Sequence, residues 1–193
     1  RMAVCKKQAK AVSGDFKAII PARTLNEITR LLEKEEEELN VVLQKNNLMV
    51  EVGSTVLVSR LYEGEFINYK QILPTSFLTE FTVDKDQLLN SVERAAILSR
   101  SDRLSLVKMD VKEKFLNVTA KSEIGTVNEN ISIALKGKDL SIAFNAKYLS
   151  EYLKILSDEK VRVFLNSPIA PCILRPQESE DYLYLVLPVR IKS

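Results

Sequence analysis

The chain has 193 residues, of which 46% are apolar, and its 28 basic and 26 acidic residues leave a net charge of only +2. This composition supports a buried core but excludes a polycation, so binding to nucleic acid would require positive charge gathered on one surface. Two cysteines in no metal-like spacing, and no apolar run near membrane-spanning length, indicate a reducing compartment, no disulfide framework and no membrane anchor.

The first part of the chain reads as strands around one helix. Met2–Cys5 is a short apolar strand, and because the chain opens inside it without a signal peptide, we expect the natural start to be missing. Phe16–Ile20 alternates as a half-buried strand does, and Pro21 marks the start of a helix running to about Lys34. Three strands follow, at Leu39–Gln44, Leu48–Val52 and Thr55–Leu61.

The second part repeats this order after a connector. Phe77–Val83 alternates as a half-buried strand, and Asp84 stands at a helix N-cap position with Gln87 three residues later. The residues that follow place an apolar face at helical spacing. Three more strands are expected, at Ser105–Lys112, Phe115–Ala120 and Gly125–Leu135.

The third part has the same pattern. Leu140–Leu156 reads as a strand, then Asn145, then a helix, and strands are expected at Lys160–Leu165, Pro171–Leu174 and Tyr182–Val189. The three helix starts at Pro21, Asp84 and Asn145 lie 63 and 61 residues apart, so the chain contains an internal repeat. Short helices alternate with antiparallel hairpins, which predicts the α+β class rather than a parallel sheet.

Catalytic signals are scarce. The chain has no histidine, and its five glycines are scattered, which excludes histidine-based catalysis, histidine-ligated metals and a glycine-rich phosphate loop. We therefore expect a protein that is not an enzyme and that needs no metal or cofactor. A hydrolase using serine and lysine stays open as an alternative, although no particular pair of residues stands out.

The polar faces of the three helices carry basic residues. Successive helices repeat this feature, which favours a modest positive surface facing nucleic-acid phosphates over lysines that are merely solvated. The candidate DNA-facing residues are Arg23 and Arg30 in the first helix, Lys85 and Arg94 in the second, and Lys147 and Lys154 in the third.

Five segments in this order resemble one known family, the bacterial DNA polymerase III β subunit or β sliding clamp. They are RMAVC (1–5), EGEFINYKQILP (63–74), SVERAAILSRSD (91–102), IAFNAKYLSEYL (142–153) and YLVLPVRI (184–191). The resemblance covers essentially the whole chain. It implies a clamp fold, in which repeated strand–helix–strands units place antiparallel sheets outside and helices on the inner face of a ring.

The resemblance also implies a domain division and a role. Residues 1–74 correspond to the second half of the clamp's middle domain, and residues 75–193 to its complete C-terminal domain. The family is a non-catalytic processivity factor: a ring homodimer encircles duplex DNA and tethers the DNA polymerase III catalytic subunit and other replication and repair proteins. A clamp loader places the ring on DNA, in the bacterial cytoplasm at the nucleoid. We expect this chain alone to be monomeric.

The family's peptide-binding cleft, which receives short motifs with an aromatic or leucine anchor, maps onto residues far apart in this chain. By the resemblance these are Arg1, Met2, Ile67, Gln71, Ile72, Asn145, Tyr148, Ile169, Pro171, Leu185, Val186, Leu187, Pro188, Val189, Arg190 and Ile191. Read without the resemblance, Leu185, Leu187 and Val189 would be strand core, and Tyr148 would be helix core. Gln71 and Lys70 stand where the family often has two arginines.

The ring interface of the family maps onto Ile97 and Leu98, near the end of the second helix. From the residues alone, Ile97 is equally consistent with helix core. The alternative to a clamp is an α+β peptide-binding adaptor without DNA contact, and helix-face charge is the feature that separates the two.

Overall fold

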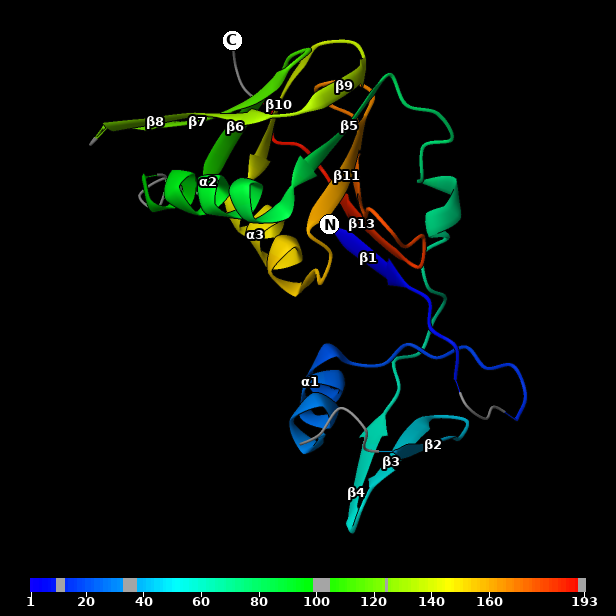
Figure 1. The fold of residues 1–193 in the computed structure, drawn as a ribbon. Coiled ribbons are helices and arrows are strands. Elements are labelled where there is room, and N and C mark those ends of the chain that lie inside the picture. Colours follow the sequence, from blue (N-terminus) through cyan, green and yellow to red (C-terminus); the bar gives the residue numbers. More distant parts are fainter. Residues whose placement is uncertain (10–12, 33–37, 99–104, 124, 191–193) are drawn as a thin grey trace. The chain divides into compact units, whose positions relative to one another are not determined.

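A computed structural model describes residues 1–9, 13–32, 38–98, 105–123 and 125–190 (Figure 1). The chain divides into two compact units. The smaller unit is Ala9–Ile72, and the larger unit combines Arg1–Gln8 with Leu73–Ser193. These compact units are not the same as the predicted clamp domains. The assignment of residues 1–74 to the middle domain and of residues 75–193 to the C-terminal domain stays a prediction.

The smaller unit packs one helix on one sheet. Helix α1 (Ala22–Leu31) precedes the antiparallel strands β2 (Leu39–Leu43), β3 (Asn47–Val52) and β4 (Thr55–Arg60), which pair in the order β2-β3-β4. A short 3-10 helix, η1 (Tyr69–Gln71), follows. Leu48, Val50 and Val52 alternate along β3 and are buried against apolar residues of α1. The period-two pattern of the strand therefore forms this small core.

The larger unit has two antiparallel sheets. The first, in the order β1-β13-β12-β11-β5-β9, joins β1 (Met2–Cys5) to β13 (Tyr182–Val186), β12 (Cys172–Pro176), β11 (Lys160–Leu165), β5 (Thr79–Asp84) and β9 (Ala134–Gly137). The second, in the order β10-β6-β7-β8, joins β10 (Leu140–Asn145), β6 (Leu106–Val111), β7 (Phe115–Ser122) and β8 (Gly125–Ser132). These strands confirm the α+β class.

Two helices, α2 (Lys85–Leu98) and α3 (Ala146–Ile155), lie against each other beside these sheets (Figure 1). Each begins at a predicted cap: the Asp84 carboxylate accepts the Gln87 N–H at 2.8 Å, and the Asn145 side chain accepts the Lys147 N–H at 2.9 Å. These bonds satisfy N–H groups that a helix start leaves without partners. The first residues of α1, α2 and α3 lie 63 and 61 positions apart, which confirms the repeat.

The core of the larger unit lies between helices and sheets. Leu88, Val92 and Ala95 of α2 and Leu149 and Leu153 of α3 are buried with the inward residues of both sheets. Each Å² of apolar surface removed from water contributes about 25 cal/mol to stability, so this cluster is the main source of the larger unit's stability.

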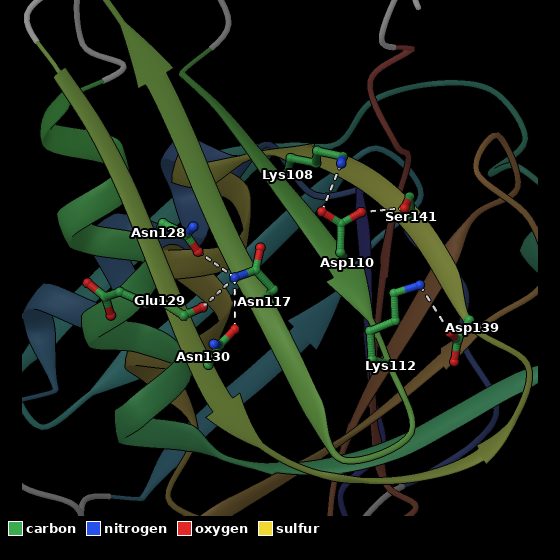
Figure 2. A network of polar contacts seen from close by, with 9 residues as sticks. All are labelled: Lys108, Asp110, Lys112, Asn117, Asn128, Glu129, Asn130, Asp139 and Ser141. Carbon is green, nitrogen blue, oxygen red and sulfur yellow. Dashed lines mark hydrogen bonds and ion pairs between the residues drawn. The ribbon is translucent and has the colours of Figure 1, made fainter.

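The four-stranded sheet β10-β6-β7-β8 has a polar face on the side turned away from this core (Figure 2). On β7, Asn117 donates its side-chain amide to the side-chain oxygens of Asn128 at 2.5 Å and Asn130 at 2.8 Å. Lys108 bonds to Asp110 at 2.8 Å on the same sheet. These partners are side chains of the chain itself, so the face is a satisfied polar surface rather than a second core.

Three predicted elements need correction. The strand expected at Phe16–Ile20 does not form, because only Ile19 meets a partner, an isolated bridge to Tyr62. The strand expected at Gly125–Leu135 is two strands, because β8 pairs with β7 whereas β9 pairs with β5 in the other sheet. The strand expected at Tyr182–Val189 ends at Val186, because the chain leaves the first sheet there.

Candidate functional site

One end of the six-stranded sheet gathers residues that are far apart in the sequence. Met2 pairs with Leu185, and Cys172 pairs with Val186. Because both ladders are antiparallel, the residues next in line, Arg1, Pro171 and Leu187, follow at the same end of the three strands. Backbone pairing alone thus places these predicted cleft residues together.

Arg1 and Tyr148 form one of the contacts between this sheet end and helix α3. The guanidinium carbon of Arg1 lies 4.4 Å from the centroid of the Tyr148 ring, a cation–π arrangement. Arg1 also forms an ion pair with Glu151, one turn further along α3. The two contacts hold the start of β1 against the first turns of α3.

Tyr184 supports Tyr148 from below the surface. Its hydroxyl donates a 2.9 Å hydrogen bond to the backbone carbonyl of Tyr148, and its ring stacks on Tyr152 with 4.7 Å between centroids. Burial raises the pKa of the Tyr184 hydroxyl, so the group stays protonated and remains a donor at neutral pH. Tyr148 is therefore positioned by fixed neighbours, although its own ring reaches solvent.

The segment after β13 crosses from the first sheet to the second. Val186 is fully buried, Leu187 is 55% exposed, and the Val189 N–H donates a 2.8 Å bond to the carbonyl of Ala143 on β10. β10 leads directly into α3, so this segment ends beside the start of the helix that carries Tyr148. Pro188 and Val189 are half-buried and Arg190 is exposed.

Three of the predicted cleft residues are exposed apolar or aromatic side chains of the larger unit. Ile169 is 63% exposed, Leu187 55% and Tyr148 36%. Partly exposed apolar groups beside a few fixed polar groups are the usual composition of a peptide site. The prediction of helix core for Tyr148 from its spacing alone is wrong, and strand core holds for Leu185 but not for Leu187.

The other predicted cleft residues belong to other segments of the chain. Asn145 caps α3, so its side-chain oxygen is already occupied by the Lys147 N–H. Ile67, Gln71 and Ile72 are exposed residues of the smaller unit. Ile191 lies outside the described residues.

The cations predicted to face DNA are mostly ion-paired. Arg94 binds Glu129, Lys154 binds Glu93 at 2.7 Å, and Lys147 lies 3.9 Å from Glu151. Lys85 lies 3.3 Å from Asp86 and Arg30 lies 3.1 Å from Glu27. Arg23 has no ion pair to a residue that the structure describes. The helices therefore carry positive groups whose charge is largely compensated.

A surface hollow lies between α2 and α3. Its volume is about 480 Å³, and it is lined by Glu93, Ala96, Ile97, Ser105, Lys147, Ser150 and Lys154. Ile97 is 57% exposed, so helix core is wrong for this residue, whereas Leu98 is half-buried. In the described part of the chain, no group of side chains is arranged to hold a metal ion, and no helix is long and apolar enough to cross a membrane.

The chain matches two domain families along almost its whole length. Residues 1–68 match the central domain of the DNA polymerase III beta subunit, and residues 70–190 match its C-terminal domain. The chain belongs to the DNA polymerase III beta subunit family. The matches follow each other in the order that the resemblance of the five sequence segments predicts.

Relatives of known name and structure agree with this assignment. A beta sliding clamp of Staphylococcus aureus is 29% identical over 98% of this chain. Solved structures of the beta chain from Streptococcus pneumoniae and the beta subunit from Pseudomonas aeruginosa have TM-scores of 0.89 and 0.91, with 31% and 26% identity over 97% and 98% of the chain. The chain spans about half of each relative, namely 51%, 50% and 52% of their lengths. The clamp fold predicted from sequence is confirmed.

Several residues that build the site in this clamp-family chain were not predicted. Glu151 follows Lys147 by four positions, a helical spacing that would have suggested an ion pair. Glu93 and Glu129 carry no comparable signal, because their partners lie in other elements. The same is true of Tyr184 and Ala143, whose roles depend on how the sheets meet.

Proposed function

We propose that this chain supplies the peptide-binding cleft and part of the DNA-facing surface of a replication sliding clamp. The clamp encircles duplex DNA as a ring homodimer in the bacterial cytoplasm, without catalysis. It tethers the DNA polymerase III catalytic subunit and other motif-bearing proteins, and a clamp loader places it. The match of both domain families across the chain supports this proposal most directly.

The sheet end of the larger unit supports the peptide-binding part. Arg1, Pro171 and Leu187 converge there, and Tyr148 lies under Arg1. An anchor side chain of a partner peptide can pack on Leu187 and Tyr148. Residues 187–190 can offer backbone groups to an extended peptide, except the Val189 N–H, which already binds Ala143. A short peptide must be ordered on binding, so the affinity of one site is expected to be modest.

Titration of a labelled peptide with an aromatic and leucine anchor tests this assignment. Leu187→Asp should abolish binding, because it puts a charge into the apolar contact. Val58→Asp is the matched control, since Val58 is an apolar residue of β4 that is 66% exposed and lies in the smaller unit. Equal binding by the Leu187→Asp variant and the native chain would place the site elsewhere.

An α+β peptide-binding adaptor without DNA contact is the second candidate. The ion pairs on α2 and α3 favour it, because compensated cations attract phosphate weakly. Retention on circular duplex DNA by the full-length ring, measured over a salt series, separates the two. Retention that is independent of DNA sequence supports the clamp, and none at any salt supports the adaptor.

A further inference from the structure

The Arg94–Glu129 pair joins helix α2 to strand β8 by two parallel bonds. Arg94 Nε lies 2.5 Å from one carboxylate oxygen of Glu129, and Nη2 lies 2.5 Å from the other. This two-pronged geometry occupies one of the paired N–H edges that a guanidinium can present to a phosphate, and the carboxylate offsets its charge. Arg94 is 54% exposed and Glu129 only 27%, so the acid is the more fixed partner.

The Lys154–Glu93 pair joins α3 to α2 across the hollow between the two helices. The Lys154 Nζ lies 2.7 Å from a Glu93 carboxylate oxygen, with exposures of 58% and 42%. Lys147 and the hydroxyl-bearing Ser150 line the same hollow, so a phosphate there would meet two ammonium groups. Glu93 is the one carboxylate that lines the hollow among the described residues, and it holds one of those two groups.

A carboxylate and a phosphate compete for the same cation. Each is an anionic oxygen acceptor, so a DNA phosphate can bind Arg94 or Lys154 fully only if the acid is displaced or shared. Exposed ion pairs are weak, so such displacement is feasible, but it lowers the gain from each phosphate contact. The acids thus reduce DNA affinity while leaving the cations in position.

We propose that Glu93 and Glu129 tune the DNA-facing surface, by holding Lys154 and Arg94 in ion pairs that a phosphate must displace. This inference rests on the proposed clamp function. Contacts weakened in this way suit a protein that follows duplex DNA without arresting on it, because each contact can exchange its phosphate for its own carboxylate and back.

The test measures binding of a fluorescently labelled duplex to the 193-residue chain at low ionic strength and over a salt series. Glu93→Gln and Glu129→Gln keep the shape of the side chain and remove its charge. Each should bind the duplex severalfold more tightly than the native chain, and the slope of log affinity against log salt should steepen by up to about 0.9.

Glu113→Gln is the matched control. It removes the same charge from the exposed turn between β6 and β7, where Glu113 has no ion pair to another described residue. An equal gain in affinity with Glu113→Gln would show that net charge alone acts, and it would overturn the inference.

Arg94→Gln and Lys154→Gln separate this inference from the proposed function. If they weaken binding while Glu93→Gln and Glu129→Gln change nothing, the surface contacts DNA but the acids do not tune it. If none of the variants, nor the native chain, binds duplex at the lowest salt, the DNA-facing assignment and the tuning role both fall. Tighter binding only in the two acid variants supports the inference.

Discussion

The guanidinium of Arg1 lies 4.4 Å above the ring of Tyr148, and this contact joins the first strand of the chain to helix α3. We expect Tyr148→Ala to weaken peptide binding about tenfold, because it removes an aromatic contact surface and one of the two contacts that hold Arg1. Tyr148→Phe retains the ring and should bind as the native chain does. Fluorescence titration with the labelled peptide measures both, and a strong loss in the phenylalanine variant would instead implicate the hydroxyl.

Asn145 stabilises the start of helix α3, in addition to its predicted role in the peptide-binding cleft. Asn145→Ala should lower the free energy of unfolding by about 1 kcal/mol, because the Lys147 N–H loses its acceptor at the start of α3. Asn145→Ser should restore most of that stability. Urea unfolding of the two variants gives the stability effect. If Asn145 also contacts the peptide, the serine variant will bind weakly despite its recovered stability.

The pH dependence of stability should report the Arg94–Glu129 pair. The hydrogen bonds from Arg94 hold the pKa of the Glu129 carboxyl below its ordinary value of 4.5. A carboxyl with a depressed pKa in the folded state stabilises the fold above its unfolded pKa, and this stabilisation is lost as pH falls through the folded pKa. We therefore expect part of the acid sensitivity of the chain to disappear in Arg94→Gln.

An NMR titration of the Glu129 carboxyl measures this directly. In Arg94→Gln the pKa of Glu129 should rise toward its ordinary value, and unfolding curves at acid pH should converge with those of the native chain. An unchanged Glu129 titration would mean that the two side chains do not pair in solution.

Gly137 is placed where only glycine fits. Its φ is +106°, and a Cβ there would collide with the carbonyl oxygen of Leu78, the residue just before β5. Gly137→Ala should therefore cost at least about 2 kcal/mol of stability, from strain and from displacement of β9. Gly53→Ala is the control: it also has a positive φ, +54°, but nothing lies within 4 Å of its Cβ. Urea unfolding should rank the first variant well below the second.

The local elements could be predicted because their signals are local. Asp84 and Asn145 predict helix starts because their side chains can accept a backbone N–H of the first turn. The alternation of apolar and polar residues along β5 and β11 predicts their buried faces. The 61- and 63-residue spacings then reveal the repeat without any knowledge of contacts. A window of sequence contains all the information that such elements need.

Strand partners and long-range ion pairs could not be predicted in this way. Ile133 looks like one more residue of a long strand, yet the chain changes sheets there. Glu129 and Arg94 are 35 positions apart, and nothing in either local pattern links them. Membership of the cleft was likewise available only through the family resemblance, because Tyr148 by spacing alone belongs to a helix core.

The C-terminal segment provides the sharpest test of the cleft. Removal of Pro188–Ser193 eliminates the Val189–Ala143 hydrogen bond, the half-buried Pro188 and Val189, and the exposed Arg190. Val186 and the buried part of β13 remain, so the fold should persist with a loss of about 1 kcal/mol from that bond. Peptide binding should nevertheless be abolished, because the backbone groups and apolar side chains after Leu187 are gone.

Circular dichroism and urea unfolding test the fold of the shortened chain, while titration of the labelled peptide measures its binding. Equal affinity of the shortened and native chains would exclude residues 188–193 from the peptide site. Tyr148 and Arg1 alone would then not form the cleft proposed for this end of the sheet.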